Sequence, residues 1–469
     1  MSSEQLLANI RDGKTLTKGQ MIFLSVMLSL PAIMSQLTSI AMQYIDAAMV
    51  GSLGAEASAA IGIVASSTWF FSGVSMSIVQ GFSIQVAQYI GAKRFAKARE
   101  ILHQSYYVVM GISLAFVCVG LLISSRLPLW LGGDGSIAAN ATMYFRIYIG
   151  FLPVMVMARL SGAMLQCTGN MKIPGIFNSL MCVFDVFFNF LFIFPARALG
   201  IGGMEIMLPG LGLGVAGAAL GTGMASLVSM CGMVWFLLKR TPMLEKEEGE
   251  KPAFHREDVT KAFRIALPIA FERMVVSGGS VVTTRIVAPL GAVSIAANSL
   301  SVTAESLCYM PCFGIAEAAS TITGQCIGAG RKETAKQMGG IILLFGMALM
   351  ACSGTLLYLF APQMIGFLTP DGAVQALGAR VLRIEAFAEP LYGASIVAAG
   401  VLRGAGDTLI PSIMNLVSLW AVRIPLSFLL VRPYALIGVW IAMCVELCFR
   451  GTIFLIRFLR GRWIRMSNS

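Results

Sequence analysis

Long apolar blocks, separated by short polar segments, follow one another along almost the whole chain. Most of these blocks reach about 20 residues, the length that a helix needs to cross ~30 Å of hydrocarbon. Lipid offers the backbone no hydrogen-bond partner, so such blocks predict transmembrane helices, and the two longest are expected to contain breaks or interfacial turns. The expected spans are 21–48, 57–88, 101–125, 140–166, 174–195, 214–238, 262–286, 294–326, 338–362, 376–402, 411–431 and 435–457.

Composition supports a membrane protein. Of the 469 residues, 57% are hydrophobic and only 12% are charged, and the mean hydropathy is +0.80. A soluble domain carries about 25% charged residues. A chain of this length with half that fraction has too little polar surface to remain in water. The expected fold class is therefore an all-α polytopic membrane protein with twelve transmembrane helices.

The net charge of +11 comes from basic residues that gather in alternate loops. They are Arg11, Lys14, Lys18, Lys93, Arg94, Lys97, Arg99, Lys172, Arg331, Lys332, Lys336, Arg457, Arg460, Arg462 and Arg465, with further ones in the central linker. The intervening loops hold little beyond Arg126, Arg197 and Arg432. Because positive residues favour cytoplasmic loops, both termini and the linker are expected in the cytoplasm, with the chain in the cell (inner or plasma) membrane. This placement explains the net charge without a nucleic-acid partner.

No signal peptide is expected, because the polar N-terminal tail has no cleavage-type apolar core. All ten cysteines lie within or beside apolar segments. Their expected role is that of small buried hydrophobic residues rather than disulfides or metal ligands.

The second half of the chain repeats the first at a fixed offset of 237 residues. Leu30-Pro31 aligns with Leu267-Pro268, VGSLGA at 50–55 with VAPLGA at 287–292, and AQYIGAKR at 87–94 with GQCIGAGR at 324–331. Ungapped matches at Pro, Gly, Gln and Arg do not follow from apolar composition alone. With six spans in each half, the repeats are parallel and related by a pseudo-twofold along the membrane normal. Two such six-helix bundles could give alternating access by rocking against each other.

The expected organisation places the two bundles between polar segments. It comprises a cytoplasmic tail (1–20), an N-lobe (21–238), a cytoplasmic linker (239–258), a C-lobe (259–458) and a cytoplasmic C-terminal tail (459–469). The first half contains an additional Gly- and Pro-rich stretch, about 195–213, which is expected to be an extended external loop. The acidic run EKEEGE at 245–250 is interpreted as plain linker.

Five segments occur in a characteristic order, spacing and duplication: LPAIMSQLTSIAMQYIDAAMVGSLGAEASAAIG, VAQYIGAKRFAKA, LQCTGNMKIP, GQCIGAGRKETAK and LRGAGDTLIP. Through them the chain, over about 20–460, resembles the multidrug and toxic compound extrusion (MATE) transporters. The resemblance implies a twelve-helix fold of two six-helix lobes with an outward-facing V. It also implies antiport, in which amphipathic and often cationic organic molecules are exported in exchange for H⁺ or Na⁺. No cofactor is expected besides this coupling ion, and the expected partners of a functional monomer are small-molecule substrates and the lipid bilayer.

Asp46 lies late in the first expected span. Together with Ser35, Gln36, Ser39 and Gln43 it falls within about 100° on a helical wheel, which predicts a polar stripe facing the lobe interior. A charge at mid-membrane costs ~2.5–3.5 kcal/mol on insertion scales and therefore needs a reason. A carboxylate in an enclosed, wet site can take up and release a proton, and the resemblance places a membrane-embedded acid at this position. The alternative is a helix-end carboxylate satisfied by water or backbone.

Asp185 and Asn189 lie one turn apart on one face of the fifth expected span. The resemblance implies an Asn and an Asp one turn apart here, acting with the first-helix acid Asp46 and a threonine on helix six that Thr222 matches. In this chain the order is exchanged, aspartate first, which moves the charge by one turn. These four residues form the candidate H⁺ or Na⁺ site. Interhelical hydrogen bonding is the alternative role for Asn189 and Thr222.

Glu272, in the seventh expected span, matches a position where many members of the family carry a glutamate, and an ion pair with Arg273 is the alternative. Weaker candidates are Glu305 and Glu317 in the eighth span and Glu385 and Glu389 in the tenth, which Arg383, Arg403 and Arg423 could neutralise. Sodium-type members carry an aspartate on the tenth helix, where this chain has Tyr392.

The membrane carboxylates are not duplicated, although the scaffold is. At the 237-residue offset Asp46 maps to Thr283, Asp185 to Val422 and Glu272 to Ser35. An architectural charge would be expected in both halves. The mismatch predicts that ion coupling is concentrated in the first lobe.

Two other classes of protein remain open at this point. A flippase for lipid-linked precursors or polysaccharides, from a related superfamily, should hold several arginines in its cleft to neutralise pyrophosphate. A receptor or scaffold that does not transport would not need titratable residues on polar stripes. Enzymatic chemistry is not expected, because the chain has two histidines, no nucleotide-binding loop and no catalytic-triad pattern.

Overall fold

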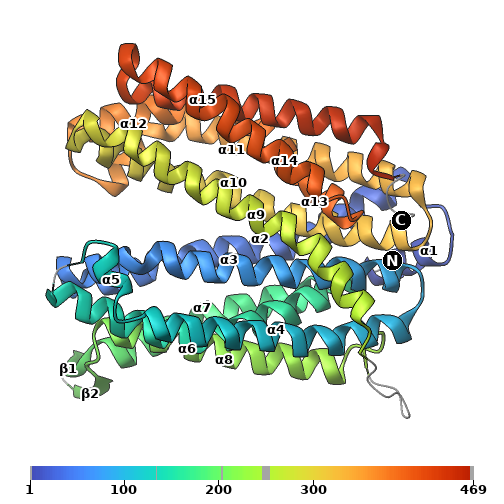
Figure 1. Ribbon diagram of the computed structural model, residues 1–469, viewed down its shortest axis with the longest axis horizontal. Coiled ribbons are helices and arrows are strands. Elements are labelled where there is room, and N and C mark those ends of the chain that lie inside the picture. The colour runs from blue at the N-terminus through green and yellow to red at the C-terminus, as the bar shows by residue number, and fades with distance from the viewer. Residues whose placement is uncertain (1–2, 134, 202–203, 246–253, 465–469) are drawn as a thin grey trace.

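The computed structural model describes residues 3–133, 135–201, 204–245 and 254–464, and long helices dominate it (Figure 1). The first half contains α2 (Lys18–Gly51), α3 (Ala55–Gly91), α4 (Phe95–Ile123), α5 (Leu127–Trp130), α6 (Gly135–Cys167), α7 (Lys172–Ile193) and α8 (Val215–Lys239). The second half contains α9 (Arg256–Val287), η1 (Ala288–Leu290), α10 (Ala292–Gly328), α11 (Lys332–Leu368), α12 (Gly372–Glu385), α13 (Glu389–Gly404), α14 (Leu409–Val417), the π-helical segment η2 (Ser418–Arg423) and α15 (Ile424–Arg460). The short η3 (Arg462–Ile464) ends the described chain.

Within the described residues, nine helical segments are long and apolar enough to cross a membrane. They are α2, α3, α4, α6, α7, α8, α9, α11 and the continuous run Leu409–Arg460. The second half contributes fewer segments for two reasons: some of its expected spans are divided by breaks or joined into one run, and α10, an unbroken helix of 37 residues, is not among the nine. The expected span 376–402 is divided into α12 and α13, and α15 kinks at Ala435, whose φ of 49° and ψ of −131° are non-helical. The two longest expected spans, 57–88 and 294–326, lie in the continuous helices α3 and α10, without the breaks that were expected in them.

The sequence repeat recurs in the backbone at the same offset. Helices α3 and α10 begin and end at matching residues, α6 and α13 end at Cys167 and Gly404, and α7 and α14 begin together. Lys93, with φ of 58°, matches Gly330, with φ of 71°. A left-handed conformation costs a non-glycine residue ~1–2 kcal/mol, so the first half retains this turn even where lysine replaces glycine.

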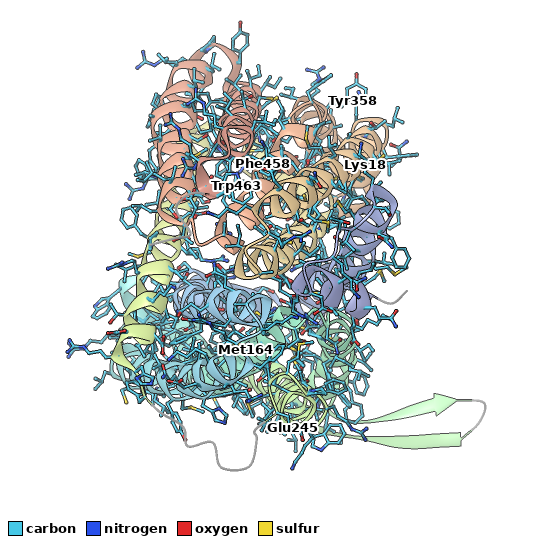
Figure 2. All side chains as sticks on the ribbon, turned by 90° about the vertical axis from the view of Figure 1, so that its right-hand side faces the viewer. Lys18, Met164, Glu245, Tyr358, Phe458 and Trp463 are labelled. Atoms are coloured by element: carbon cyan, nitrogen blue, oxygen red, sulfur yellow. The ribbon has the colours of Figure 1, made fainter. Side chains whose placement is uncertain are left out.

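The two halves pack on each other by exchanging equivalent helices. Helix α2 of the first half packs on α10, and α9 of the second half packs on α3, which is the same pairing under the repeat. Seen almost along the helices, α2 and α9 lie on opposite flanks between the two groups (Figure 2). The contact between the halves therefore has approximate twofold symmetry.

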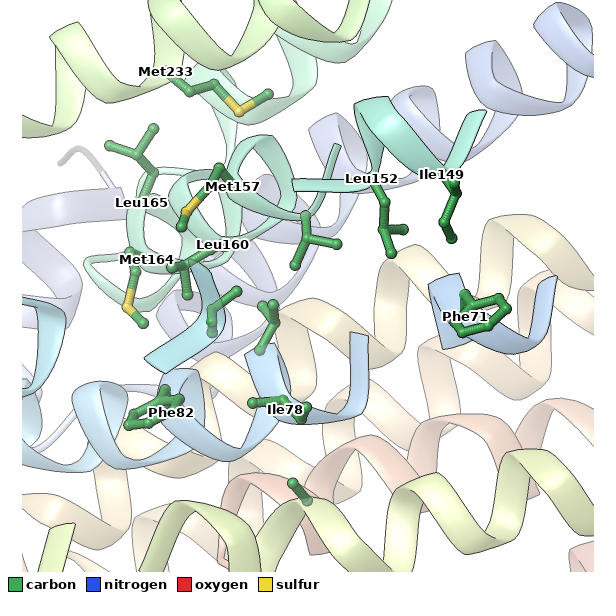
Figure 3. Packing of buried hydrophobic residues seen from close by; sticks show 14 of the residues in the cluster. Phe71, Ile78, Phe82, Ile149, Leu152, Met157, Leu160, Met164, Leu165 and Met233 are labelled. Carbon is green, nitrogen blue, oxygen red and sulfur yellow. The ribbon is translucent and has the colours of Figure 1, made fainter. Parts of the chain in front are cut away.

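Large apolar side chains fill the interior of the first half. Phe71, Ile78 and Phe82 on α3 face Leu160 and neighbouring residues on α6 (Figure 3). Phe82 and Leu160 are fully buried. Close packing of this kind holds α3 and α6 in fixed relative positions.

Both chain termini lie at one end of the molecule, which we call the basic end (Figure 1). Here Lys93 forms an ion pair with Asp12, with 2.5 Å between Nζ and Oδ1, and Arg331 donates to the carbonyl oxygens of Gly13 and Lys14. Basic loops from both halves thus meet the N-terminal segment at this end.

The predicted polar tail 1–20 is not extended. It contains α1 (Ser3–Arg11), whose Leu6, Leu7 and Ile10 are buried because their spacing places them on one helix face. Helix α2 then begins at Lys18, with Thr17 as its N-cap, and the helices that flank the linker, α8 and α9, end and begin within a few residues of the predicted limits.

The predicted extended loop at 195–213 is instead mostly an antiparallel hairpin of β1 (Pro195–Ile201) and β2 (Met204–Leu211). The hairpin projects from the side of the helical body (Figure 2). Most of the acidic run 245–250 and residues 465–469 of the predicted C-terminal tail, which include Arg465, lie outside the described residues. The first part of that tail, 459–464, contains the end of α15 and η3.

Candidate functional site

Three of the predicted ion-coupling residues meet inside the first half. The amide nitrogen of Asn189 donates to Asp46 Oδ1 and to Asp185 Oδ2, at 2.9 Å in each case. Asp185 and Asn189 come from successive turns of α7, and Asp46 comes from α2, which packs on α7. The exchanged order of aspartate and asparagine therefore still brings both carboxylates to one amide.

This site is enclosed. Asp185 is fully buried, Asn189 is 1% exposed and Asp46 is half-buried. A Cβ atom on Gly221 of α8 would lie 2.1 Å from Asn189 Oδ1, so only glycine allows α8 to approach this closely. The fit between α7 and α8 holds the asparagine between the two acids.

Thr222 and Tyr144 complete the surroundings. The Thr222 hydroxyl donates to the carbonyl oxygen of Ala218 on its own helix at 3.2 Å and lies near Asp185. Tyr144 of α6 is close enough to interact electrostatically with both acids. Tyr144 is a neighbour of the site that the sequence analysis did not predict.

The donor set suits a small cation. The two carboxylates share the Asn189 amide as a donor, and none of the ion pairs among the described residues includes either acid. Asp185 Oδ1 and Asn189 Oδ1 are buried acceptors without a donor. Converging oxygens of this kind can bind a proton or Na⁺, since hard cations take carboxylate, amide and hydroxyl oxygen ligands. The described residues contain no group of three or more His, Cys, Asp and Glu side chains that could hold a metal ion.

The residues of the predicted polar stripe on α2 contact different halves of the molecule: Asp46 lies in the first-half site, whereas Gln36 contacts the second half. Gln36 donates to Glu317 Oε1 of α10 at 3.2 Å, and Gln166 at the end of α6 donates to Glu317 Oε2 at 3.1 Å. Gln43 is exposed. Glu317 thus belongs to the contact between the halves and lies apart from the group around Asp46.

Glu272 is bound on every side. Arg403 approaches both carboxylate oxygens, at 2.9 and 3.1 Å, and Ser412 and Asn415 donate to them at 2.9 and 2.7 Å. The ion-pair partner is Arg403 of α13, and the adjacent Arg273 is not the partner. This arrangement is that of a satisfied structural ion pair, although a coupling role for Glu272 stays a prediction.

A second carboxylate cluster lies in the second half. Glu385 and Glu389 flank the break between α12 and α13, and all four of their carboxylate oxygens are buried without a hydrogen-bond partner. The arginines expected to satisfy them bind elsewhere: Arg403 to Glu272, Arg383 to the Tyr358 carbonyl and Arg423 to the Met443 sulfur. Glu305 lies near the two glutamates. Glu446, which accepts two bonds from Arg450 at 2.7 and 2.8 Å, belongs to the same region and was not selected from the sequence.

Two glutamines join the halves symmetrically near the basic end. Gln88 of α3 donates to the carbonyl oxygen of Gly404 at 3.1 Å, and Gln325 of α10 donates to that of Cys167 at 2.7 Å. Each donor and each acceptor maps onto the other at the 237-residue offset. The acceptors are the last residues of α13 and α6, whose terminal carbonyls lack partners within their own helices. Each half therefore caps a helix of the other.

Comparison with known proteins agrees with this duplicated architecture. The MatE family model matches residues 31–191 and again residues 268–429, once in each half. "Probable multidrug resistance protein NorM" of Thermotoga maritima is 26% identical over 445 residues, which cover 93% of this chain and 92% of the relative. "Uncharacterized transporter YisQ" of Bacillus subtilis is 23% identical over 398 residues, or 84% of each chain.

Solved structures share the fold. A multidrug resistance MATE family transporter in an outward-facing conformation superposes with a TM-score of 0.88 at 19% identity, covering 100% of this chain and 99% of that one. The Vibrio cholerae MATE transporter VcmN in its bent form gives 0.85 at 18% identity, covering 99% of both chains.

The fold and site define a polytopic helical membrane transporter built from two repeated halves, with carboxylates enclosed in its interior. The chain belongs to the MatE family, the multidrug and toxic compound extrusion transporters, as its sequence motifs predicted.

Proposed function

We propose that this chain is an H⁺- or Na⁺-coupled antiporter that exports amphipathic, cationic organic compounds. The observation that carries the proposal is the bridge from Asn189 to both Asp46 and Asp185. Two carboxylates held on one amide without a basic partner have their charge reduced by binding a proton or Na⁺. Release of that cation restores the negative charge.

Coupling follows if the cation and the substrate favour different states of the transporter. An antiporter needs each ligand to shift the same conformational equilibrium in opposite directions. Asp46 is the half-buried member of the site, so it is the group through which the cation enters and leaves. Asn189 and Thr222 position the acids and offer oxygen ligands to Na⁺. Glu272, Glu317 and Glu389 are secondary candidates for coupling.

The transport cycle is proposed to be rocking of two six-helix lobes, with twelve spans in all. The interrupted pairs α12–α13 and α14–α15, the latter divided again at Ala435, supply the spans beyond those that are continuous. The basic end is assigned to the cytoplasm, because positive residues favour that side. The protein acts as a monomer, since each half already supplies the other half's packing surface.

Flipping of a lipid-linked precursor is less well supported. Binding of a pyrophosphate needs arginines that are not already neutralised by carboxylates. Arg403 and Arg450 instead form ion pairs with Glu272 and Glu446. A non-transporting scaffold would have no use for two enclosed acids that share one amide donor.

The test is ethidium efflux from proteoliposomes that contain the purified chain, first under a pH gradient alone and then under a sodium gradient alone. Efflux under one gradient names the coupling ion, and efflux under neither would refute antiport. Asp46→Asn should abolish gradient-driven efflux while leaving expression and monodispersity unchanged. Glu56→Gln, which removes an exposed carboxylate, is the matched control and should keep full activity.

A further inference from the structure

A groove of about 390 Å³ lies between α14 and the last turns of α15. Its apolar wall is formed by Ile410, Ile413, Met414 and Val417 of α14 with Phe449 and Ile453 of α15. Three arginines close its end at the basic end of the molecule: Arg457, Arg460 and Arg462. An apolar channel that ends in positive charge is a feature that neither the ion site nor the contact between the halves uses.

The groove exists because α14 packs on α9 more extensively than on α15. One face of α14 carries Ser412 and Asn415, which donate to Glu272 of α9. The opposite apolar face is left towards α15. Of that face, Ile413 and Val417 are 44% and 45% exposed, and because this part of the chain lies in a candidate membrane-spanning run, the face is open to lipid.

Two of the three guanidinium groups are available to a ligand. Arg457 is engaged by Asp407, with 2.5 Å between Nη2 and Oδ2. Arg460 and Arg462 are exposed, and none of the ion pairs among the described residues includes them. The charge at the mouth of the groove is therefore close to +2.

The backbone holds both arginines at this mouth. Gly461 between them ends α15 in a left-handed conformation, with φ of 64°, and reverses the chain. Trp463 then stacks on Phe458 with 5.8 Å between ring centroids and donates to the Phe458 carbonyl at 3.0 Å (Figure 2). Trp463 is fully buried, so this turn is fixed by packing against the helical body.

We propose that this groove binds an anionic phospholipid. One acyl chain lies along the apolar wall between α14 and α15, and the headgroup phosphate accepts hydrogen bonds from Arg460 and Arg462. Charge complementarity selects the occupant: guanidinium pairs bind phosphate in a bidentate manner, and a zwitterionic headgroup neutralises the pair less well. The other face of α14 carries Ser412 and Asn415, which donate to Glu272. A lipid that holds α14 in place therefore also stabilises the ion pair between Glu272 and Arg403.

The binding test uses the purified full-length protein and native mass spectrometry, with phosphatidylglycerol titrated against phosphatidylcholine. We expect phosphatidylglycerol to bind preferentially and to raise the melting temperature. Arg460→Gln with Arg462→Gln should weaken that binding by roughly 10- to 30-fold, as expected for two basic residues lost near an anionic surface. The control Arg94→Gln with Lys336→Gln removes the same charge from exposed positions elsewhere at the basic end and should leave binding unchanged.

Equal binding of both lipids to the wild-type protein, or equal phosphatidylglycerol binding to the wild type and the double arginine variant, would overturn the proposal. A melting shift produced equally by glycerol 3-phosphate would also overturn it, since the acyl chain would then be irrelevant. Ile413→Trp, which fills the groove and keeps both arginines, provides an independent variant should the double variant fail to fold. It should lose phosphatidylglycerol binding, and retained binding in it would count against the groove.

Discussion

The reciprocal glutamine caps make a quantitative prediction about the balance between conformations. Replacing Gln88 and Gln325 by methionine keeps most of the side-chain volume but removes both amide donors. The carbonyls of Gly404 and Cys167 then lose these hydrogen-bond donors from the opposite half. Water can reach these carbonyls once the halves separate but not while they are packed together, so the closed basic end is destabilised selectively.

The size of the effect follows from the energy of a hydrogen bond. A typical intramolecular hydrogen bond contributes ~1 kcal/mol net, so losing two costs about 2 kcal/mol. That corresponds to a shift of roughly 30-fold in the equilibrium towards the state opened at the basic end. Gln325 also accepts from Arg11 at 3.1 Å, which makes its replacement the more costly of the two.

Double electron–electron resonance between spin labels on the two halves can measure this shift in the conformational equilibrium. Ala96 and Glu333 are exposed, equivalent positions at the starts of α4 and α11. Spin labels at Cys substitutions there report the separation of the halves, on a background from which the three exposed cysteines have been removed: Cys118, Cys231 and Cys352. The double glutamine variant should show a new, longer distance population.

The control is Gln337→Met, which alters an exposed glutamine of α11. Its distance distribution should match that of the parent protein. A distribution in the double glutamine variant that also matches the parent, under conditions in which substrate or ion does shift it, would refute the reasoning that these caps hold the basic end closed.

Three further outcomes are expected. Asn189→Leu removes two hydrogen bonds to acids, each worth ~1.5–3 kcal/mol, so cation-driven efflux should fall at least about tenfold, and undiminished efflux would contradict the site. Glu272→Gln removes the charged partner of the half-buried Arg403 but keeps an oxygen that can accept from it, so thermal unfolding should show a loss of ~1.5–3 kcal/mol; adding Arg403→Met should restore most of the loss, and no recovery would argue against a simple pair. The hydrogen bond and charge of Lys93 hold the pKa of Asp12 below its ordinary value. That pair therefore contributes fully above about pH 4 and is lost only as the pH falls through the lowered pKa, so amide-exchange protection of α1 should be constant from about pH 5 to 8; a loss of protection within that range would contradict this assignment.

The repeated architecture could be predicted because prolines and glycines that shape the backbone recur at the same offset in both halves. Pro31 with Pro268 and Gly54 with Gly291 align at the offset, and the latter pair both have positive φ in the structure. The acids Asp46 and Asp185 could be found for a similar reason, since charge within an apolar span is conspicuous. Their convergence on one amide followed from helical periodicity together with the family resemblance.

Other features of the structure could not be predicted from the sequence. Gln88 and Gln325 look like ordinary polar residues near helix ends, and their acceptors are backbone atoms, which any residue supplies. The partner of Glu272 was assigned to its neighbour Arg273 as the alternative, whereas the true partner lies on another helix, and sequence distance carries no information about such pairs. The hairpin at 195–211 was missed because its strands lack regular alternation of polar and apolar residues.

Helix α1 has no counterpart among the residues of the second half that the structure describes, yet it touches both halves. Leu7 packs against Gly169 of the first half, while Arg11 bonds Gln325 of the second. The contact between the halves has approximate twofold symmetry, but a single segment, α1, bridges the two halves at one edge of it. A donor–acceptor dye pair with one fluorophore on the N-terminus would consequently report each opening of the transporter in real time, and the speed at which α1 detaches would set an upper limit on turnover.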